Sequence, residues 1–283
     1  MFGHLITSQD GTRILAPLLA RQEGPPIVFI HGFICSGLNW VRQFNDKQLL
    51  DNLYMIRGHG RSDKPASEGA YIFAKHAEDF QAVCTAFNVT KPIVISWSLC
   101  EIVVADVLSR YDASPLPVVG HAFLNGITWM SMSQEIQKPS QPAIISSILS
   151  RDTTEFQKGL EAFMRDFVAP GNSISDEDKR VWVESAAGMA KNAAARKLSL
   201  SRTQDETALL SVADELPTLF IQGTEDALLD SKKHEQLMKK RFGANLDYRT
   251  LLGAGNAPFY ELLEVVNPMI LQFAQRLSYG VLY

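Results

Sequence analysis

Apolar runs of strand length alternate along this 283-residue chain with longer segments whose apolar residues recur at helical spacing. Runs such as 26–30 and 92–95 are apolar at successive positions, as is typical of strands that are covered on both faces. Because parallel strands are joined by crossover helices, this alternation predicts an α/β fold with a mostly parallel central sheet flanked by helices. The hydrophobic content of 46% suits a single large domain.

The order of the expected elements is regular except for one long interruption. A hairpin turn is expected at 8–11, where Ser-Gln-Asp-Gly separates two short β-like runs. The expected strands are 26–30, 53–56, 92–95, 118–124, 218–222 and 247–252, and the expected helices are 72–88, 99–111, 231–242 and 259–277. Residues 129–212 are helical, polar and methionine-containing without strand signals, which predicts an inserted helical lid between core segments 1–128 and 213–283.

The charge and the cysteine content exclude several classes of function. A net charge of -4, without a block of basic residues, gives no electrostatic footprint for nucleic acid or for an anionic membrane. No apolar run is long enough to span a bilayer and no secretory leader is recognisable, so we expect a soluble, cytoplasmic protein without membrane insertion. The three cysteines have no metal-ligand spacing, so free thiols and neither a metal nor a cofactor are expected. The expected partner is an apolar small molecule, whereas the oligomeric state stays open.

Four short motifs occur in a fixed order along the chain. They are His31-Gly32-Phe33 after the first buried strand, Arg57-Gly58-His59-Gly60-Arg61-Ser62, Ser96-Trp97-Ser98-Leu99-Cys100 after the third, and Gly223-Thr224-Glu225-Asp226. In this order they resemble the oxyanion loop, the RGHGxS turn, the nucleophile elbow and the acid loop of the α/β-hydrolase superfamily. The resemblance covers nearly the whole chain outside 129–212, and it implies an α/β-hydrolase fold.

The nucleophile elbow is a strained strand-to-helix turn in which small residues two before and two after the serine let the chains pass closely. Glycine usually fills both places, whereas this chain has Ser96 and Cys100, which we expect to shift or relax the turn. The resemblance places the nucleophile at Ser98 and the oxyanion donors at the backbone N–H groups of Leu99 and Phe33. The plainer alternative for Ser98 is a helix N-cap without chemistry.

The late loop that carries the family's histidine reads Gly253-Ala254-Gly255-Asn256 here. An amide has no proton to exchange near neutral pH, so Asn256 cannot act as the general base for the serine. Asp226, at the place of the triad acid, then needs another hydrogen-bond donor or a raised pKa. The catalytic positions are therefore predicted to be Ser98, Asp226 and Asn256, although Asp226 can also serve as a helix cap and Asn256 as a turn residue.

The remaining candidate site residues are apolar or aromatic, with one histidine. The resemblance places them near the elbow or on the lid, where they would form an adaptable apolar pocket, and packing in the core is the alternative for each. The expected substrate-binding residues are His31, Trp97, Trp129, Met130, Phe163, Phe167 and Trp182. His31 is also the histidine that could replace the missing base, although its usual role in the family is structural.

Three functions remain compatible with these residues. The first is a small-molecule enzyme that performs a non-hydrolytic reaction, such as a cyclisation, isomerisation or elimination, of the kind found in secondary metabolism. It needs a shaped pocket and placed hydrogen bonds but no activated serine. The second is residual hydrolysis of an ester, lactone or epoxide, and the third is a ligand-binding pseudoenzyme. A cofactor-independent oxygenase is disfavoured, because that family also relies on a late histidine.

Overall fold

A six-stranded parallel sheet, in the order β4-β3-β5-β6-β7-β8, forms the centre of the computed structural model. Its strands are β3 (Ile27–Ile30), β4 (Asn52–Tyr54), β5 (Ile93–Trp97), β6 (Gly120–Leu124), β7 (Thr218–Gly223) and β8 (Leu246–Leu251). Strands β1 (His4–Thr7) and β2 (Arg13–Ala16) form the expected antiparallel hairpin beside it. The prediction of an α/β fold with a parallel central sheet is confirmed. The structure describes residues 3–278 apart from 17–25, 47–48, 50–51, 55, 112–113, 191 and 202.

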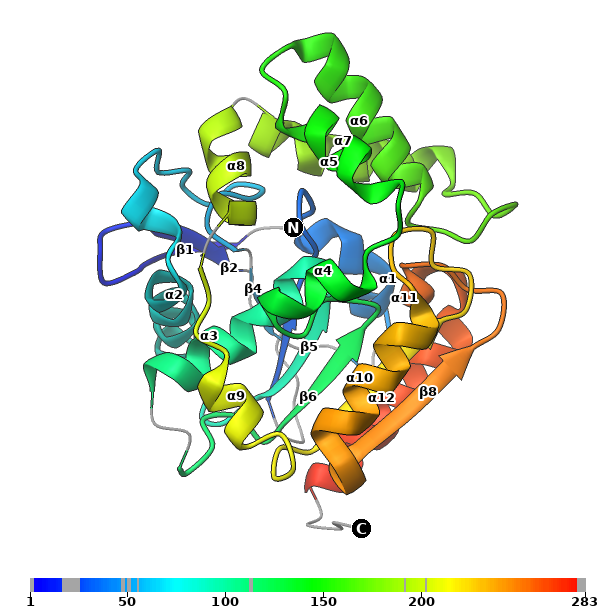
Figure 1. Cartoon of the computed structure of the whole chain (residues 1–283). Coiled ribbons are helices and arrows are strands. Elements are labelled where there is room, and N and C mark those ends of the chain that lie inside the picture. Colours follow the sequence, from blue (N-terminus) through cyan, green and yellow to red (C-terminus); the bar gives the residue numbers. More distant parts are fainter. Residues whose placement is uncertain are drawn as a thin grey trace.

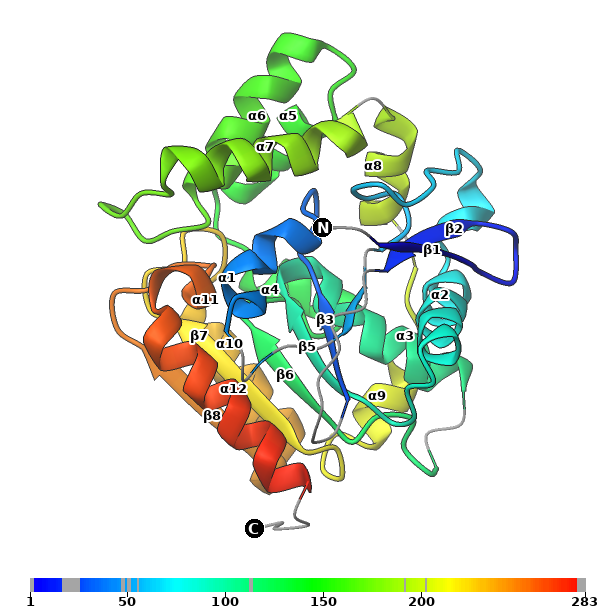
Figure 2. The ribbon, with the colours of Figure 1, turned by 180° about the vertical axis from the view of Figure 1, so that it is seen from behind.

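Helices cover both faces of the sheet. Helix α10 lies in front of the strands in Figure 1 and α12 lies in front of them in the reverse view of Figure 2. The helices of the core are α1 (Val41–Phe44), α2 (Phe73–Ala86), α3 (Val103–Arg110), α10 (Ser231–Phe242), α11 (Pro258–Glu261) and α12 (Leu263–Ser278). Every residue of β3, β5, β6 and β7 is buried, which explains why these strands are apolar on both faces and carry no polar alternation.

Two predicted helices are each divided in the structure. The helix expected over 99–111 begins as the 3-10 helix η3 (Ser98–Ile102) and continues as α3. The closing helix is interrupted at Leu262, between α11 and α12, where the backbone leaves the helical region. The second strand, expected over 53–56, is β4, and residue 55 of that prediction lies outside the described residues.

The inserted segment between β6 and β7 is helical. It contains the 3-10 helix η4 (Met130–Met132) and helices α4 (Ser133–Ile136), α5 (Gln141–Leu149), α6 (Thr153–Arg165), α7 (Asp176–Ala190), α8 (Ala193–Ser201) and α9 (Thr207–Ser211). Helices α5 to α8 form a cap above the sheet in Figure 1, whereas α9 returns to the core and packs against α3. No helix among the described residues is long and apolar enough to cross a membrane.

Candidate active site

Ser98 occupies a strained turn directly after β5. Its φ is +62°, a left-handed value that a side chain disfavours, and η3 begins at the same residue. A Cβ atom on Gly32 would lie only 3.2 Å from the Ser98 Cβ atom, so the neighbouring loop approaches the turn as closely as glycine allows. The expected relaxation of the turn by Ser96 and Cys100 is therefore not observed at Ser98. The turn places this serine at the carboxyl ends of the parallel strands.

Leu99 and Phe33, whose backbone N–H groups are the expected oxyanion donors, both line the cavity at Ser98. Leu99 is in the first turn of η3, where N–H groups have no acceptor within the helix. Phe33 follows β3, and it lines the same cavity as Ser98 and Leu99. Ile34, the next residue, has a φ of +59°, so this loop also has a strained backbone. Donors fixed in this way can stabilise negative charge that develops on a carbonyl oxygen.

Asp226 and Asn256 are joined by a direct hydrogen bond. The Asn256 Nδ2 atom donates to Asp226 Oδ2 at 2.9 Å and to the Asn125 carbonyl oxygen at 3.0 Å. The indole N–H of Trp97 donates to the carbonyl oxygen of Asn256 at 2.8 Å and to its Oδ1 atom at 3.2 Å. Asn256 is 1% exposed. The amide is thus held on both sides, and its N–H groups point to Asp226 and to the backbone of Asn125.

The Asp226 carboxyl group is completely buried and accepts four hydrogen bonds. Besides Asn256, the donors are Asn125 Nδ2 at 2.8 Å and the backbone N–H groups of Leu228 and Leu229 at 2.8 and 3.1 Å. Burial raises the pKa of Asp226, and the hydrogen bonds from Asn256, Asn125 and the two backbone groups offset part of that rise. The carboxyl group therefore finds substitute donors and also has a raised pKa.

His31 lies beneath the oxyanion loop and does not line the cavity. Its Nδ1 atom bonds the Gly32 carbonyl oxygen at 2.8 Å, and its Nε2 atom accepts from the Ile56 N–H at 3.2 Å. Both ring nitrogens are thus occupied by the backbone, and burial lowers the pKa of His31 to about 4. The expectation that His31 binds substrate needs correction, and a role as the substitute base is disfavoured for the same reason.

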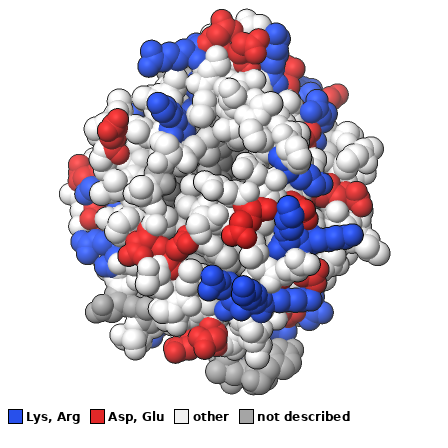
Figure 3. All heavy atoms as spheres, in the orientation of Figure 1, with Lys and Arg blue, Asp and Glu red and all other residues white. Residues whose placement is uncertain are grey.

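The cavity above Ser98 has a volume of about 180 Å³ and lies between the core and the cap. Of the predicted residues it brings together Phe33, Ser98, Leu99, Met130, Phe163 and Asn256. The others that line it are Ile127, Ser133, Gln137, Gln141, Ile145, Leu200, Leu228 and Leu229. None of these described lining residues is charged. Figure 3 shows a hollow between cap and core that is bordered mainly by uncharged atoms.

Most of the other predicted substrate-binding residues form an aromatic cluster behind the cavity. Trp97 packs edge-on against Phe167 with ring centroids 4.9 Å apart, and its ring lies 5.9 Å from that of Trp182. Phe167 and Trp182 belong to the inserted segment, so the cluster attaches the cap to the core. Trp129 is buried and precedes η4. These four residues are not in the cavity lining, because their rings are used in packing.

Two residues of the site have no counterpart among the predictions. Asn125 follows β6, has a φ of +49°, and holds Asp226 through Nδ2 while its Oδ1 atom accepts from the Gly223 N–H at 2.7 Å. Glu101 is three residues after Ser98 and is completely buried. A Cβ atom on Gly126 would lie 2.1 Å from the Glu101 carboxyl carbon and 2.3 Å from the Ser98 carbonyl oxygen. The sequence feature that could have indicated Glu101 is an acidic residue within the otherwise apolar helix that follows the elbow.

The buried Glu101 carboxyl group is expected to make the stability of the protein pH-dependent. Burial raises the pKa of this carboxyl group well above 4.5, backbone groups of Leu124 and Ser98 lower it, and Asp226 raises it. Between the unfolded and the folded pKa the native state binds more protons, so this group lowers the unfolding free energy as pH rises. Glu101→Gln should remove that decline, which amounts to at most about 1.4 kcal/mol per pH unit for one proton.

Urea denaturation at pH 5 and pH 8 measures this effect. The stability of Glu101→Gln relative to the native protein should increase from pH 5 to pH 8. Exposed Glu215, changed to Gln, is the matched control and should show no such trend. A constant difference between Glu101→Gln and the native protein would mean that Glu101 is ionised throughout this range.

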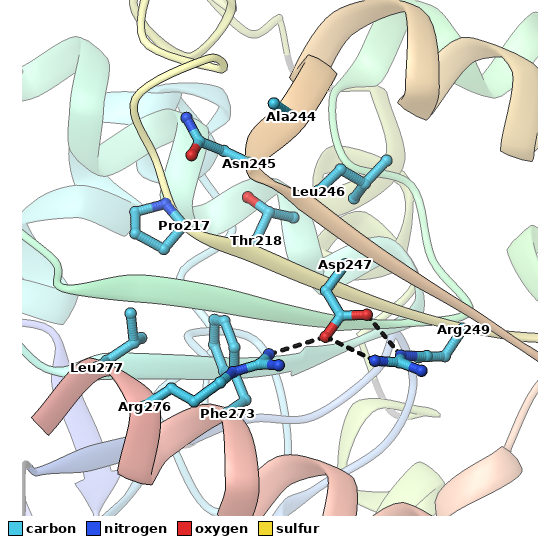
Figure 4. Close-up of a pocket in the computed structure, with 10 residues that line it drawn as sticks. All are labelled: Pro217, Thr218, Ala244, Asn245, Leu246, Asp247, Arg249, Phe273, Arg276 and Leu277. Carbon is cyan, nitrogen blue, oxygen red and sulfur yellow. Dashed lines mark hydrogen bonds and ion pairs between the residues drawn. The ribbon is translucent and has the colours of Figure 1, made fainter. Parts of the chain in front are cut away.

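A second hollow, of about 230 Å³, lies at the amino ends of β7 and β8, opposite to the Ser98 cavity. Figure 4 shows Asp247 between the guanidinium groups of Arg249 and Arg276 at this place. Both arginines thus have a carboxylate partner within the protein, and Pro217 and Thr218 are at the amino end of β7. Ligands of open parallel sheets bind beyond the carboxyl ends of the strands, so the Ser98 cavity is the candidate active site.

Comparisons with known proteins agree with this geometry. A family model described as alpha/beta hydrolase fold matches residues 25–261. The non-heme chloroperoxidase of Streptomyces lividans is 24% identical, over 95% of this chain and 99% of that protein. The crystal structure of the esterase RhEst1 from Rhodococcus sp. ECU1013 has a TM-score of 0.83 and 23% identity, and the match covers 98% of this chain and 100% of the other.

Proposed function

Because the chain belongs to the alpha/beta hydrolase fold family, we propose that it is a small-molecule enzyme that binds a neutral carbonyl compound at Ser98 and converts it without a histidine base. The observation that supports this most directly is the hydrogen bond from Asn256 Nδ2 to Asp226. In a Ser-His-Asp triad the carboxylate instead accepts a hydrogen bond from the imidazole and orients it. The relatives named above are enzymes of this fold, an esterase and a chloroperoxidase.

The proposed reaction is non-hydrolytic, namely a cyclisation, an isomerisation or an elimination. The N–H groups of Leu99 and Phe33 would polarise the carbonyl group of the substrate, while the apolar walls hold its chain in a reactive conformation. Neither contribution needs deprotonated Ser98. The Asn256 N–H groups are already bonded to Asp226 and Asn125, so only Oδ1 of this amide is available to accept a further hydrogen bond.

Slow ester hydrolysis is a second candidate, favoured by the preserved backbone strain at Ser98. Residual catalysis by an oxyanion hole and binding alone still exceeds the reaction in water by about three to four orders of magnitude when a triad is incomplete. This candidate predicts that turnover depends on the serine hydroxyl. A ligand-binding pseudoenzyme would instead bind small molecules without forming any product.

A comparison of the native protein with Ser98→Ala tests these functions. Both proteins are given a panel of p-nitrophenyl esters and a fluorophosphonate label that is read by intact mass. We expect no Ser98-dependent ester turnover and no label on Ser98, because none of the described residues that line this cavity has a basic side chain that could remove its proton. In a mixture of neutral metabolites the native protein should produce new species with the mass of the consumed compound, or that mass less a small neutral molecule. Turnover lost in Ser98→Ala would instead support the hydrolase.

A further inference from the structure

The wall that residues 133–145 of the inserted segment contribute to the Ser98 cavity has a regular pattern. Ser133, Gln137, Gln141 and Ile145 all line the cavity, and they follow one another at every fourth position along the chain. Phe163, Leu200, Leu228 and Leu229 among the other lining residues are apolar. The cavity above Ser98 thus has one amide-bearing wall, formed by exposed Gln137 and half-buried Gln141, beside walls that are mainly apolar.

The backbone at and beside Gln137 is fixed to the core. Gln137 forms an isolated antiparallel bridge with Leu229, and the Lys138 N–H donates to the Leu228 carbonyl oxygen at 2.9 Å. The Asp230 N–H donates to the Ile136 carbonyl oxygen at 2.6 Å. This part of the inserted segment is therefore tied to the loop that contains Asp226. A side chain that extends from an anchored backbone can meet a ligand at lower entropic cost than one on a mobile loop.

The side-chain amides of Gln137 and Gln141 have no hydrogen-bond partner among the described residues. In contrast, the Ser133 hydroxyl donates to the Met130 carbonyl oxygen at 2.7 Å. Each free amide offers both a donor and an acceptor. An ionised ligand group would find no opposite charge among the described lining residues, so the cost of taking it out of water would not be offset.

We propose that Gln137 and Gln141 form a recognition site for a neutral amide group of the substrate, at the same time as its reacting carbonyl lies at Ser98. This inference rests on the proposed function, since it places the reacting carbonyl in that cavity. A secondary amide has one donor and one acceptor, which two glutamine side chains can satisfy together. The substrate class is therefore an uncharged carbonyl compound with an amide in its chain and an apolar remainder that contacts Phe163 and Leu200.

Ligand-observed NMR titration with a matched pair of probes tests the recognition site without any turnover. The amide probe is N-(4-oxopentyl)acetamide, and octan-2-one is the analogue in which two methylene groups replace the amide. The double variant Gln137→Leu/Gln141→Leu keeps the approximate size of both side chains but removes their hydrogen bonds. We expect the double variant to bind the amide probe about tenfold more weakly, as the loss of neutral hydrogen bonds implies. Its affinity for octan-2-one should stay within about twofold of that of the native protein.

The control variant is Gln134→Leu, because Gln134 is an exposed residue of α4, the short helix directly before Gln137, and is not part of the cavity lining. It should bind both probes as the native protein does. The proposal is overturned if the double variant weakens both probes equally, if it leaves the amide probe unchanged, or if the anion 6-oxoheptanoate binds more tightly than the amide. Binding without amide preference contradicts this inference alone, whereas failure of both ketones to bind also contradicts the proposed function.

Discussion

Asn256→His should give the protein a Ser98-dependent esterase activity at least about a hundredfold above that of the native chain. The imidazole would replace the amide that now donates to Asp226 at 2.9 Å, and Asp226 would accept its Nδ1–H and orient the ring. The strained Ser98 turn is already in place, and Phe33 and Leu99, the expected oxyanion donors, line the same cavity. Hydrolysis of p-nitrophenyl acetate measures the gain.

The pH profile gives a second, independent reading of the same variant. A histidine base must be neutral to accept the serine proton, so the rate should rise with pH through a pKa near the ordinary value of about 6.5. Asn256→His/Ser98→Ala is the control for the nucleophile, and Asn256→Gln is the control for side-chain size. If Asn256→His folds with an unchanged melting temperature but gains no Ser98-dependent turnover, the assignment of Asn256 to the place of the base is wrong.

Arg57→Met should lower the free energy of unfolding by about 3–5 kcal/mol, because it leaves a buried carboxylate without its partner. Arg57 and Asp79 are both completely buried, and two hydrogen bonds of 2.6 Å join the guanidinium to the carboxylate. Arg57 also bonds Asp10 at 2.9 Å and the Ala70 carbonyl oxygen at 2.7 Å. Urea denaturation at pH 7 measures the loss.

The loss should be smaller at pH 5 than at pH 8. Burial raises the pKa of Asp79 while Arg57 opposes that rise, so removal of Arg57 moves the pKa further upward. An acid with a raised folded pKa costs stability only above its unfolded pKa, and the cost grows until the pH passes the folded value. Arg13→Met is the matched control, since the Arg13 side chain is 59% exposed in its pair with Asp63. It should cost at most about 1 kcal/mol at either pH, and an equal cost for both variants would contradict the prediction.

The fold could be predicted from the sequence because the apolar patterns that indicate it are local. The run 93–95 is apolar at successive positions since β5 is covered on both faces, and the helix over 73–86 has apolar spacing since one side is buried. The predicted ends of helices and strands differ from the structure where contacts between distant segments set them. The left-handed φ of Ser98 imposes a 3-10 turn ahead of α3, and helical periodicity contains no trace of that geometry.

The aromatic residues illustrate a further limit. Trp97, Phe167 and Trp182 have the composition expected of a pocket, but their rings pack on one another and join the cap to the core. Gln137 and Gln141 are polar residues within a polar segment, so nothing in their local pattern indicated that they line the cavity. The difference depends on which face of the cap is turned toward Ser98, which is a property of packing between distant segments.

The sequence alone determined the parallel α/β architecture, and it predicted the serine at the elbow and the amide at the place of the family's histidine, because each depends on local pattern or on residue chemistry. Only the tertiary structure decided how these groups are used. It placed the Asn256 amide on Asp226, added Asn125 as a second donor, buried Glu101 beneath Ser98 and turned His31 toward the backbone. The physical reason is that the hydrogen-bond partners and the burial of these side chains come from segments that are distant in sequence. These segments meet only when the carboxyl ends of β3, β5, β6, β7 and β8 come together in the sheet.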